Sequence, residues 1–291
     1  MADVNINISD NEYSNKCSIL LCVVTLFHAV SVCVFWFVSG FGISVFFSIP
    51  ERLLSDPLVD MIKRFMPLYL TNWNFTFQTI FLTMSLVYDI MEWLDKHETN
   101  IGKKLKYYRD ILFKGAVVPV TMFVSTMFWT VYWIDRELVF PKVYDQVVPW
   151  WFNHCVHTNI AIVVLVETVL QERRHPTNMK IELFLDSFIG VFYAIVYYSI
   201  YFFANRWLYG VFGIMNWWQV CLYQLLIWSS MLMFYFLQFP VNRMFHREPV
   251  MEEKVGSSEI KNGIEEGNGI DEDKNVDLKF RMSRVVDNSS L

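Results

Sequence analysis

Two short stretches of this sequence carry polar side chains whose spacing could support chemistry. Thr71, Asn74 and Gln78 recur at helical spacing, so a helix would place them on one face. Further along the chain, Asn153 stands one helical turn before His157. A threonine hydroxyl becomes an effective nucleophile when a neighbouring base such as histidine removes its proton. The two stretches therefore predict a nucleophile and a general base, provided that the fold brings Thr71 and His157 together.

These residues also have a structural interpretation. A threonine in a membrane helix commonly donates its hydroxyl proton to the carbonyl four residues earlier. A histidine there often only forms a hydrogen bond between two helices. Residue types alone favour this structural interpretation for Thr71 and His157 over catalysis.

Other catalytic chemistries lack their motifs. The GxSxG pattern of many serine hydrolases is absent, because Gly42 and Ser44 are not followed by the second glycine. The chain contains neither the HExxH motif nor a P-loop. Of its six histidines only His154 and His157 stand close together, and its five cysteines form no CxxC pair. We therefore expect no metal and no cofactor.

Long apolar segments must position these side chains. Hydrophobic residues make up 54% of the 291 residues and charged residues only 18%. Because a helix of about 20 apolar residues crosses a bilayer, we predict an all-α, six-helix transmembrane bundle. This composition excludes a soluble enzyme, and it leaves no basic surface for nucleic acid. The predicted helices cover residues 18–39, 68–90, 112–133, 150–170, 184–204 and 217–239.

The chain divides into three predicted parts. Residues 1–17 form a cytosolic N-terminal segment, and residues 18–245 form the membrane domain. Residues 246–291 are rich in Glu, Lys, Asn, Gly and Ser, which predicts a disordered acidic cytosolic tail. Lys and Arg are more numerous in the connections on the side of the N-terminus, so both termini are predicted to be cytosolic. The apolar residues 39–50 are expected to lie at the interface.

The six-helix topology places the two polar stretches at similar depth. The helices that carry them both begin at the non-cytosolic face. At 1.5 Å per residue, Thr71 lies about 6 Å and His157 about 10 Å from the start of its helix. A reaction that combines water with an amphiphile would suit this position near one leaflet boundary.

The connection between the third and fourth predicted helices carries several charges. One interpretation is that Arg136 or Lys142 contacts the carboxylate of a lipid. The alternative, which we favour, is a structured loop in which Asp135, Arg136 and Glu137 pair among themselves.

Three blocks of the sequence resemble one family of multi-pass membrane proteins, the androgen-induced and androgen-dependent TFPI-regulating proteins. The resemblance extends over about residues 17–243, and its most specific part is an NHxxHT pattern. The resemblance implies a threonine hydrolase embedded in the membrane that cleaves fatty acid esters of hydroxy fatty acids. The blocks are Tyr69-Leu70-Thr71 with Asn74 and Gln78, the segment from Asp135 to Lys142, and the segment from Pro149 to Thr158.

The resemblance implies roles for particular residues. Thr71 matches the catalytic threonine of the family, and His157, rather than His154, matches its catalytic histidine. Asn74 or Asn153 could orient the histidine or stabilise the oxyanion. The implied partners are the lipid bilayer and a lipid ester with long acyl chains. The implied location is the endoplasmic reticulum or the plasma membrane.

Two other functions stay open at this point. The chain could be a non-enzymatic scaffold or regulator that acts through its cytosolic tail. It could also be a small transporter, although the sequence suggests no paired charged residues inside the membrane, which argues against ion or proton coupling.

Overall fold

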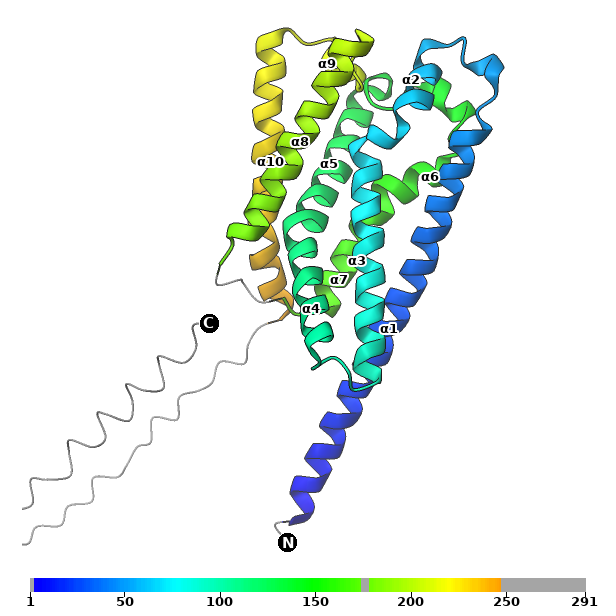
Figure 1. The fold of residues 1–291 in the computed structure, drawn as a ribbon. Coiled ribbons are helices and arrows are strands. Elements are labelled where there is room, and N and C mark those ends of the chain that lie inside the picture. The colour runs from blue at the N-terminus through cyan, green and yellow to red at the C-terminus, as the bar shows by residue number, and fades with distance from the viewer. Residues whose placement is uncertain (1–2, 174–177, 247–291) are drawn as a thin grey trace, which may run out of the picture. The chain divides into compact units, whose positions relative to one another are not determined.

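The computed structural model describes residues 3–173 and 178–246, and within them every regular element is a helix (Figure 1). Five helical segments of the described chain are long and apolar enough to cross a membrane. This confirms the predicted all-α class and a multi-pass membrane protein. The predicted tail lies outside the described residues, apart from its first residue. The five segments are Ile19–Ser48, Asn100–Leu138, Trp150–Leu170, Lys180–Ala204 and Trp217–Phe245.

The remaining predicted helix is present as α3 (Leu70–Trp93). Its 24 residues would extend about 36 Å, which is long enough to cross a bilayer. It is nevertheless not among the five apolar segments, because it carries the polar face that includes Thr71, Asn74 and Gln78. The number of membrane crossings and the cytosolic position of the termini therefore stay predictions.

Helix α1 (Asp3–Ser48) is longer than predicted. The first helix was predicted to end at residue 39, but the apolar character continues to Pro50 and the helix extends to Ser48, so the predicted end was wrong. The interfacial position of residues 39–50 stays a prediction. After α1 come η1 (Glu51–Leu53), α2 (Pro57–Phe65) and η2 (Met66–Leu68). At the start of α2, Asp56 accepts a hydrogen bond from the Leu58 amide.

The third predicted helix also begins earlier than expected. Thr99 caps α4 (Asn100–Leu112), which continues through the π-helical turn η3 (Phe113–Val117) into α5 (Val118–Asp135). The π-helical turn permits a close approach of helix α8 (Lys180–Ala204). A β-carbon added at Gly115 would lie 2.9 Å from the carbonyl oxygen of Glu182. Glycine is therefore needed at this crossing.

The fourth predicted helix, 150–170, has the predicted bounds and is interrupted by a second π-helical turn. It consists of α6 (Trp150–His154), the turn η6 (Cys155–Asn159) and α7 (Ile160–Leu170). The connection from α5 contains η4 (Arg136–Leu138) and η5 (Lys142–Gln146). The last two helices of the described residues are α9 (Gly210–Gly213) and α10 (Trp217–Phe245). Helix α10 starts with a capping box.

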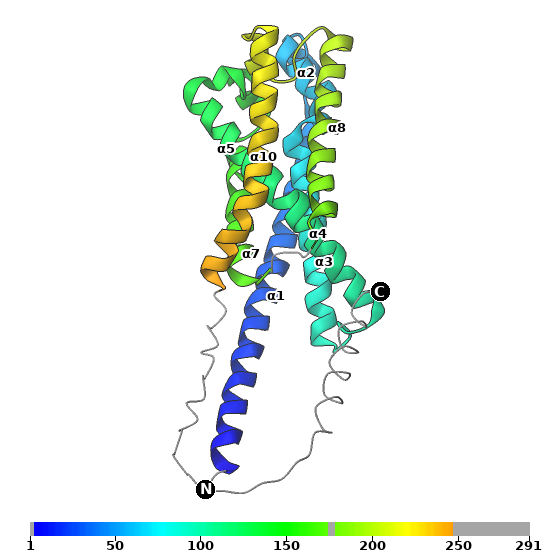
Figure 2. The same cartoon turned by 90° about the vertical axis from the view of Figure 1, so that its left-hand side faces the viewer.

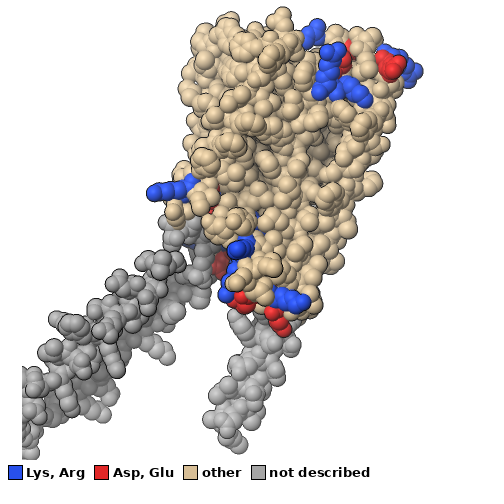
Figure 3. All heavy atoms as spheres, in the orientation of Figure 1, with Lys and Arg blue, Asp and Glu red and all other residues tan. Residues whose placement is uncertain are grey.

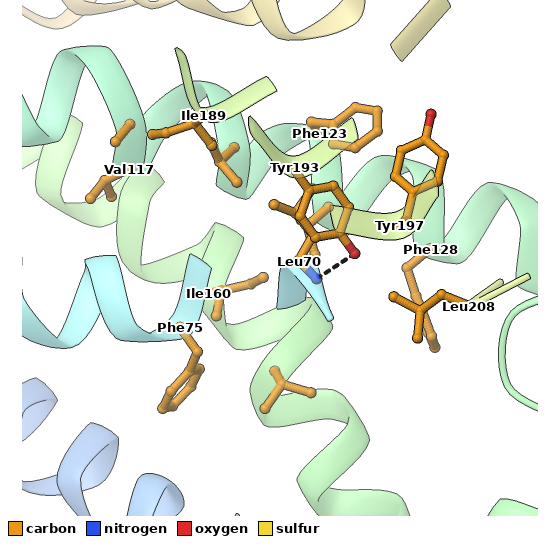
Figure 4. Close-up of a cluster of buried hydrophobic side chains, with 14 of the residues drawn as sticks. Leu70, Phe75, Val117, Phe123, Phe128, Ile160, Ile189, Tyr193, Tyr197 and Leu208 are labelled. Carbon is orange, nitrogen blue, oxygen red and sulfur yellow. Dashed lines mark hydrogen bonds between the residues drawn. The ribbon is translucent and has the colours of Figure 1, made fainter. Parts of the chain in front are cut away.

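The long helices run side by side within the described unit (Figures 1 and 2). Helix α3 packs against α1 on one side and against α4, η3 and α5 on the other, while α5 packs against α7 and α10. Aromatic and aliphatic side chains from α3, α5, α7 and α8 fill the centre (Figure 4). The start of α3 therefore lies inside the bundle, against α8 and close to η6.

Charged side chains gather near the two ends of the bundle on the face that Figure 3 shows, with a broad uncharged band between them. Large apolar side chains are exposed on several helices, and Phe203 on α8 is 92% exposed. A water-facing surface would not carry so much apolar area. The band is therefore the surface that contacts the acyl chains of the bilayer.

Candidate active site

The structure brings Thr71 and His157 together. Thr71 Oγ1 lies 3.2 Å from His157 Nε2, although 86 positions separate the two residues in the sequence. Thr71 is the second residue of α3, and His157 is the central residue of the π-helical turn η6. Such π-helical turns occur frequently at functional sites. The pairing that the spacing and the resemblance predicted is therefore geometrically available.

The surroundings of His157 define which of its nitrogens carries the proton. Nδ1 lies 3.1 Å from the backbone carbonyl oxygen of Asn153, and a carbonyl can only accept a hydrogen bond. Nδ1 therefore carries the hydrogen, and Nε2 is left to accept one from the Thr71 hydroxyl. The imidazole is 8% exposed and stacks on Phe128 with 3.5 Å between ring centroids. This arrangement suits a fixed, neutral base.

Asn153 contributes to the site in a different way from that expected. Its backbone carbonyl, rather than its side chain, contacts the imidazole of His157. Its side chain is buried, and the Oδ1 atom has no hydrogen-bond partner in the described chain. The Asn153 side chain thus lies close to the base, and its amide oxygen forms no hydrogen bond with a described residue.

Asn74 belongs to a network that joins three helices. Its Oδ1 accepts a hydrogen bond of 2.8 Å from Thr121 Oγ1 on α5. Gln78 Nε2 donates to the same hydroxyl and to the carbonyl oxygen of Ile160 on α7. All these polar side chains are buried. On the C-terminal side of Thr71, the polar face of α3 therefore holds this helix against α5 and α7.

The structure does not bring Arg136 and Lys142 to this pair as hydrogen-bond partners. Arg136 Nη2 lies 2.9 Å and 3.0 Å from the two carboxylate oxygens of Asp145. The expected pairing of Arg136 with Asp135 or Glu137 was therefore wrong, because Asp145 on the turn η5 offers both of its oxygens. Lys142 is exposed, and its backbone amide donates to Glu137 Oε1.

Two tyrosines that the sequence analysis did not single out hold the start of α3. The Leu70 amide donates to the Tyr193 hydroxyl at 2.9 Å (Figure 4). It also donates to the Tyr209 hydroxyl at 3.2 Å. The two hydroxyls lie 2.8 Å apart. Burial raises the pKa of Tyr209, in the connection between α8 and α10, to about 12. Its hydroxyl is therefore neutral at physiological pH.

The first turn of α3 leaves one amide available beside the nucleophile. The first four amides of a helix have no partner within that helix. The Leu70 amide is occupied by the two tyrosines, and the Asn72 and Trp73 amides donate to the Tyr69 carbonyl. The Thr71 amide forms no hydrogen bond with another described residue. It stands at the positive end of the helix dipole.

Three cavities lie around the pair. The first, the α5–α8–α10 cavity, is lined by Thr71 and is almost wholly apolar. The second, the histidine-side cavity, is lined by Thr71, His157 and Asn153. The third, the α1–α6 cavity, is lined by residues of α1, α3 and α6. It shares lining residues with the second cavity, namely Met66, Asn72, Phe152 and Val156.

Buried charges elsewhere were missed by the sequence analysis. His28 on α1 lies between two carboxylates, with Nδ1 2.6 Å from Asp89 Oδ2 and Nε2 2.9 Å from Glu167 Oε2. Arg173 also contacts the carboxylate of Glu167. All four side chains are buried. The cluster joins α1, α3 and α7, and no local spacing pattern connects its members.

A second ion pair links two of the apolar segments. Lys114 Nζ lies 2.8 Å from Glu182 Oε1, and the Tyr235 hydroxyl donates to Glu182 Oε2. The expectation that the membrane segments hold no paired charges was therefore wrong, and it no longer argues against a transporter. In both clusters protein groups of opposite charge face each other. No group of three or more His, Cys, Asp or Glu side chains in residues 3–173 and 178–246 is arranged so that it could hold a metal ion.

Comparison with known proteins relates this chain to a family of membrane proteins. The model of the FAR-17a/AIG1-like protein family matches residues 65–243, which contain Thr71 and His157. The chain is 34% identical over 148 residues to the androgen-dependent TFPI-regulating protein of Homo sapiens, covering 50% of this chain and 62% of that relative. It is 30% identical over 115 residues to the androgen-induced gene 1 protein of Homo sapiens, covering 38% and 48%. Each match thus spans less than two thirds of the relative. No solved structure matches the chain.

Proposed function

We propose that this chain, which belongs to the FAR-17a/AIG1-like protein family, is an integral membrane lipid hydrolase that cleaves fatty acid esters of hydroxy fatty acids. The observation that carries the proposal is the distance of 3.2 Å between Thr71 Oγ1 and His157 Nε2. The substrate class comes from the family resemblance, and the apolar cavities beside Thr71 support it.

The reaction proceeds in two halves. Nε2 of His157 takes the hydroxyl proton of Thr71 while Oγ1 attacks the ester carbonyl carbon. The tetrahedral intermediate then breaks its bond to the alcohol oxygen, which receives the proton from His157, and an acyl-threonine ester remains. In the second half His157 deprotonates a water, which attacks that ester and releases the fatty acid. The proton returns to Thr71.

The negative charge on the attacked oxygen needs donors. The Thr71 amide and the positive end of the α3 dipole lie beside the nucleophile, and such preorganised dipoles stabilise the charge that develops in the transition state. The Asn153 side chain lines the same cavity as His157, which supports its role as a second donor. Asn74 instead holds α3 in place through Thr121.

The membrane supplies the substrate. A lipid ester diffuses laterally into the bundle and places its acyl chains among aromatic and aliphatic side chains. The exposed ammonium of Lys142 contacts a headgroup carboxylate in this proposal, while Arg136 is engaged with Asp145.

The direct test is hydrolysis of a hydroxy-fatty-acid ester by membranes that contain the full chain at matched expression. The variants are Thr71→Ala and His157→Ala. The controls are Thr83→Ala, at a threonine on the same helix that lines none of the three cavities, and His154→Ala, one turn from His157. We expect both test variants to lose about 10²-fold to 10⁴-fold in rate. The controls stay active because neither residue contacts the pair.

Two results would contradict the proposal. If no variant differs from membranes without the protein, the chain does not hydrolyse this class of ester, and a non-enzymatic scaffold or regulator is the better account. If all variants are as active as the wild type, the protein is a hydrolase with its site elsewhere.

A further inference from the structure

Thr71 lies at the junction of two cavities, whereas His157 lines only one of them. Thr71 lines both the α5–α8–α10 cavity and the histidine-side cavity. His157 and Asn153 line the histidine-side cavity alone. An ester whose carbonyl carbon sits at Thr71 Oγ1 can therefore extend in two directions that are chemically different.

The proton transfers determine which half of the ester lies in which direction. The alcohol oxygen leaves with the proton that His157 Nε2 carries, so this oxygen must lie on the side of the imidazole. The acyl carbon bears the attacking Oγ1 and the leaving oxygen, and its hydrocarbon chain points away from the base. The chain then enters the cavity that Thr71 lines without His157.

We infer that the α5–α8–α10 cavity binds the acyl chain transferred to Thr71, and that the alcohol half occupies the histidine-side cavity and its continuation between α1 and α6. This inference rests on the proposed function and adds a substrate orientation to it. It assigns the acyl-chain preference and the alcohol preference of the enzyme to two separate sets of residues.

The dimensions of the α5–α8–α10 cavity suit a hydrocarbon chain. Its lining extends over about two turns of each of the three helices, which is about 12 Å along the helix axis. These turns cover residues 123 to 131, 189 to 197 and 223 to 231. Val124, Gly190 and Met231 line its cytosolic-side end under the predicted topology. Because the substrate arrives from acyl chains that are as apolar as this lining, chain-length preference comes from packing in the cavity.

The other side suits the alcohol half. The histidine-side cavity includes the polar side chains Tyr69, Asn72, Tyr144 and Asn153. A hydroxy fatty acid carries a carboxylate in addition to its chain, and polar groups are needed to solvate it. The α1–α6 cavity continues from there and is lined by apolar residues such as Val38, Ile43 and Phe47. It offers room for the second chain.

Two series of esters with the full-length protein in lipid nanodiscs test the inference. In the acyl series the alcohol is constant and the acyl group grows from butanoyl to stearoyl. In the alcohol series the acyl group is constant and a secondary alcohol grows over the same range. The matched variants are Val124→Phe in the first cavity and Val148→Phe in the histidine-side cavity, since both valines are 6% exposed.

We expect Val124→Phe to lower kcat/KM for stearoyl relative to butanoyl esters by about tenfold or more, because the added ring overpacks the part of the cavity that only a long chain reaches. The relative kcat/KM values within the alcohol series should stay unchanged. Val148→Phe should instead lower kcat/KM for long relative to short alcohols and leave the relative values within the acyl series unchanged. If Val124→Phe does not fold, Met231→Ala, which removes a 3% exposed side chain from the same cavity, should shift the acyl preference toward longer chains.

The inference is wrong if Val124→Phe and Met231→Ala change the alcohol profile, or if neither changes the acyl profile. A different result would contradict the proposed function itself. If the wild type hydrolyses no member of either series faster than Thr71→Ala, the hydrolase proposal fails before the orientation of the substrate comes into question.

Discussion

The hydroxyl of Thr71 differs from those of the other threonines on α3 because of its place in the helix. Thr76, Thr79 and Thr83 each donate to the carbonyl oxygen four residues earlier. Thr71 is the second residue of α3, so the carbonyl four positions before it lies outside the helix. Its hydroxyl is thus available to His157. Position in the helix, rather than residue type, thus excludes the hydrogen bond to the carbonyl four residues earlier for Thr71, and its role as nucleophile stays a proposal.

A prediction at the residue scale concerns the tyrosines that hold the first turn of α3. Replacing both Tyr193 and Tyr209 by Phe leaves the Leu70 amide without acceptors. We expect kcat to fall by about tenfold in the double variant, which corresponds to the loss of one hydrogen bond. Each single variant should lose less because one hydroxyl remains. Ester hydrolysis at saturating substrate measures the effect.

The control is Tyr201→Phe, because Tyr201 lies on the same helix as Tyr193, lines none of the three cavities and forms no hydrogen bond with another described residue. The pH dependence gives a further check. Since burial raises the pKa of Tyr209 to about 12, its neutral hydroxyl is lost only as the pH rises through that value. The difference between wild type and Tyr209→Phe should therefore stay constant up to about pH 10, the ordinary pKa of tyrosine. A difference that vanishes near pH 8 would contradict this account.

Sequence reasoning could find Thr71 and His157 because each lies in a local pattern of polar residues within an apolar segment. It could not find Tyr193 and Tyr209, since tyrosines are frequent in membrane proteins and these two act through the Leu70 amide on another helix. It also missed the partners of His28, because Glu167 stands 139 positions away. Long-range pairs of this kind become visible only in three dimensions.

At the scale of elements, helix ends were predictable where a strong local signal marks them. The fourth predicted helix has the predicted bounds because Pro149 precedes it and polar residues follow it. The end of α1 was predicted at residue 39, whereas the helix extends to Ser48, because the segment stays apolar and carries no stop signal before Pro50. The π-helical turns η3 and η6 were not predicted, because close packing of neighbouring helices leaves no local sequence pattern.

A prediction at this scale tests the crossing of η3 with α8. In Gly115→Ala the new methyl would lie 2.9 Å from the Glu182 carbonyl oxygen, which is backbone and cannot turn aside. We expect the free energy of unfolding to fall by about 1–3 kcal/mol, as overpacking usually costs. Thermal unfolding of the detergent-solubilised protein, followed by tryptophan fluorescence, measures the change.

Gly40→Ala is the matched control for this variant. Gly40 also lies within a helix, but a β-carbon there would meet no atom within 4 Å. Alanine favours a helix over glycine by about 1 kcal/mol, so this variant should be neutral or slightly more stable. Equal melting temperatures for the two variants would show that the crossing of η3 and α8 is not constrained as described.

At the scale of the whole molecule, the open question is how many helices cross the bilayer. Five apolar segments meet the requirements of length and composition, and α3 has the length but carries a polar face. That face is buried against α5 and α7 rather than exposed to lipid. A helix covered by its neighbours can cross the membrane with fewer apolar residues, because its polar groups are satisfied inside the protein.

The position of the two termini distinguishes five crossings from six. We expect tags at the N-terminus and at the C-terminus both to be accessible to antibody after the plasma membrane alone is permeabilised. Six crossings return the chain to the side on which it began, and the distribution of Lys and Arg places that side in the cytosol. Accessibility of only one tag would indicate an odd number of crossings and would contradict the placement of α3 as a spanning helix.

The most direct test of the central claim is covalent labelling of the full-length protein with a fluorophosphonate, followed by mass spectrometry of the labelled peptide. The account predicts that the phosphonyl group is attached to Thr71, that Thr71→Ala is not labelled, and that His157→Ala is labelled at least about 10²-fold more slowly. Thr83→Ala, at a threonine of α3 that lines none of the three cavities, should be labelled like the wild type. Attachment to another residue, or equal labelling rates for His157→Ala and the wild type, would contradict the assignment of Thr71 and His157 as nucleophile and base.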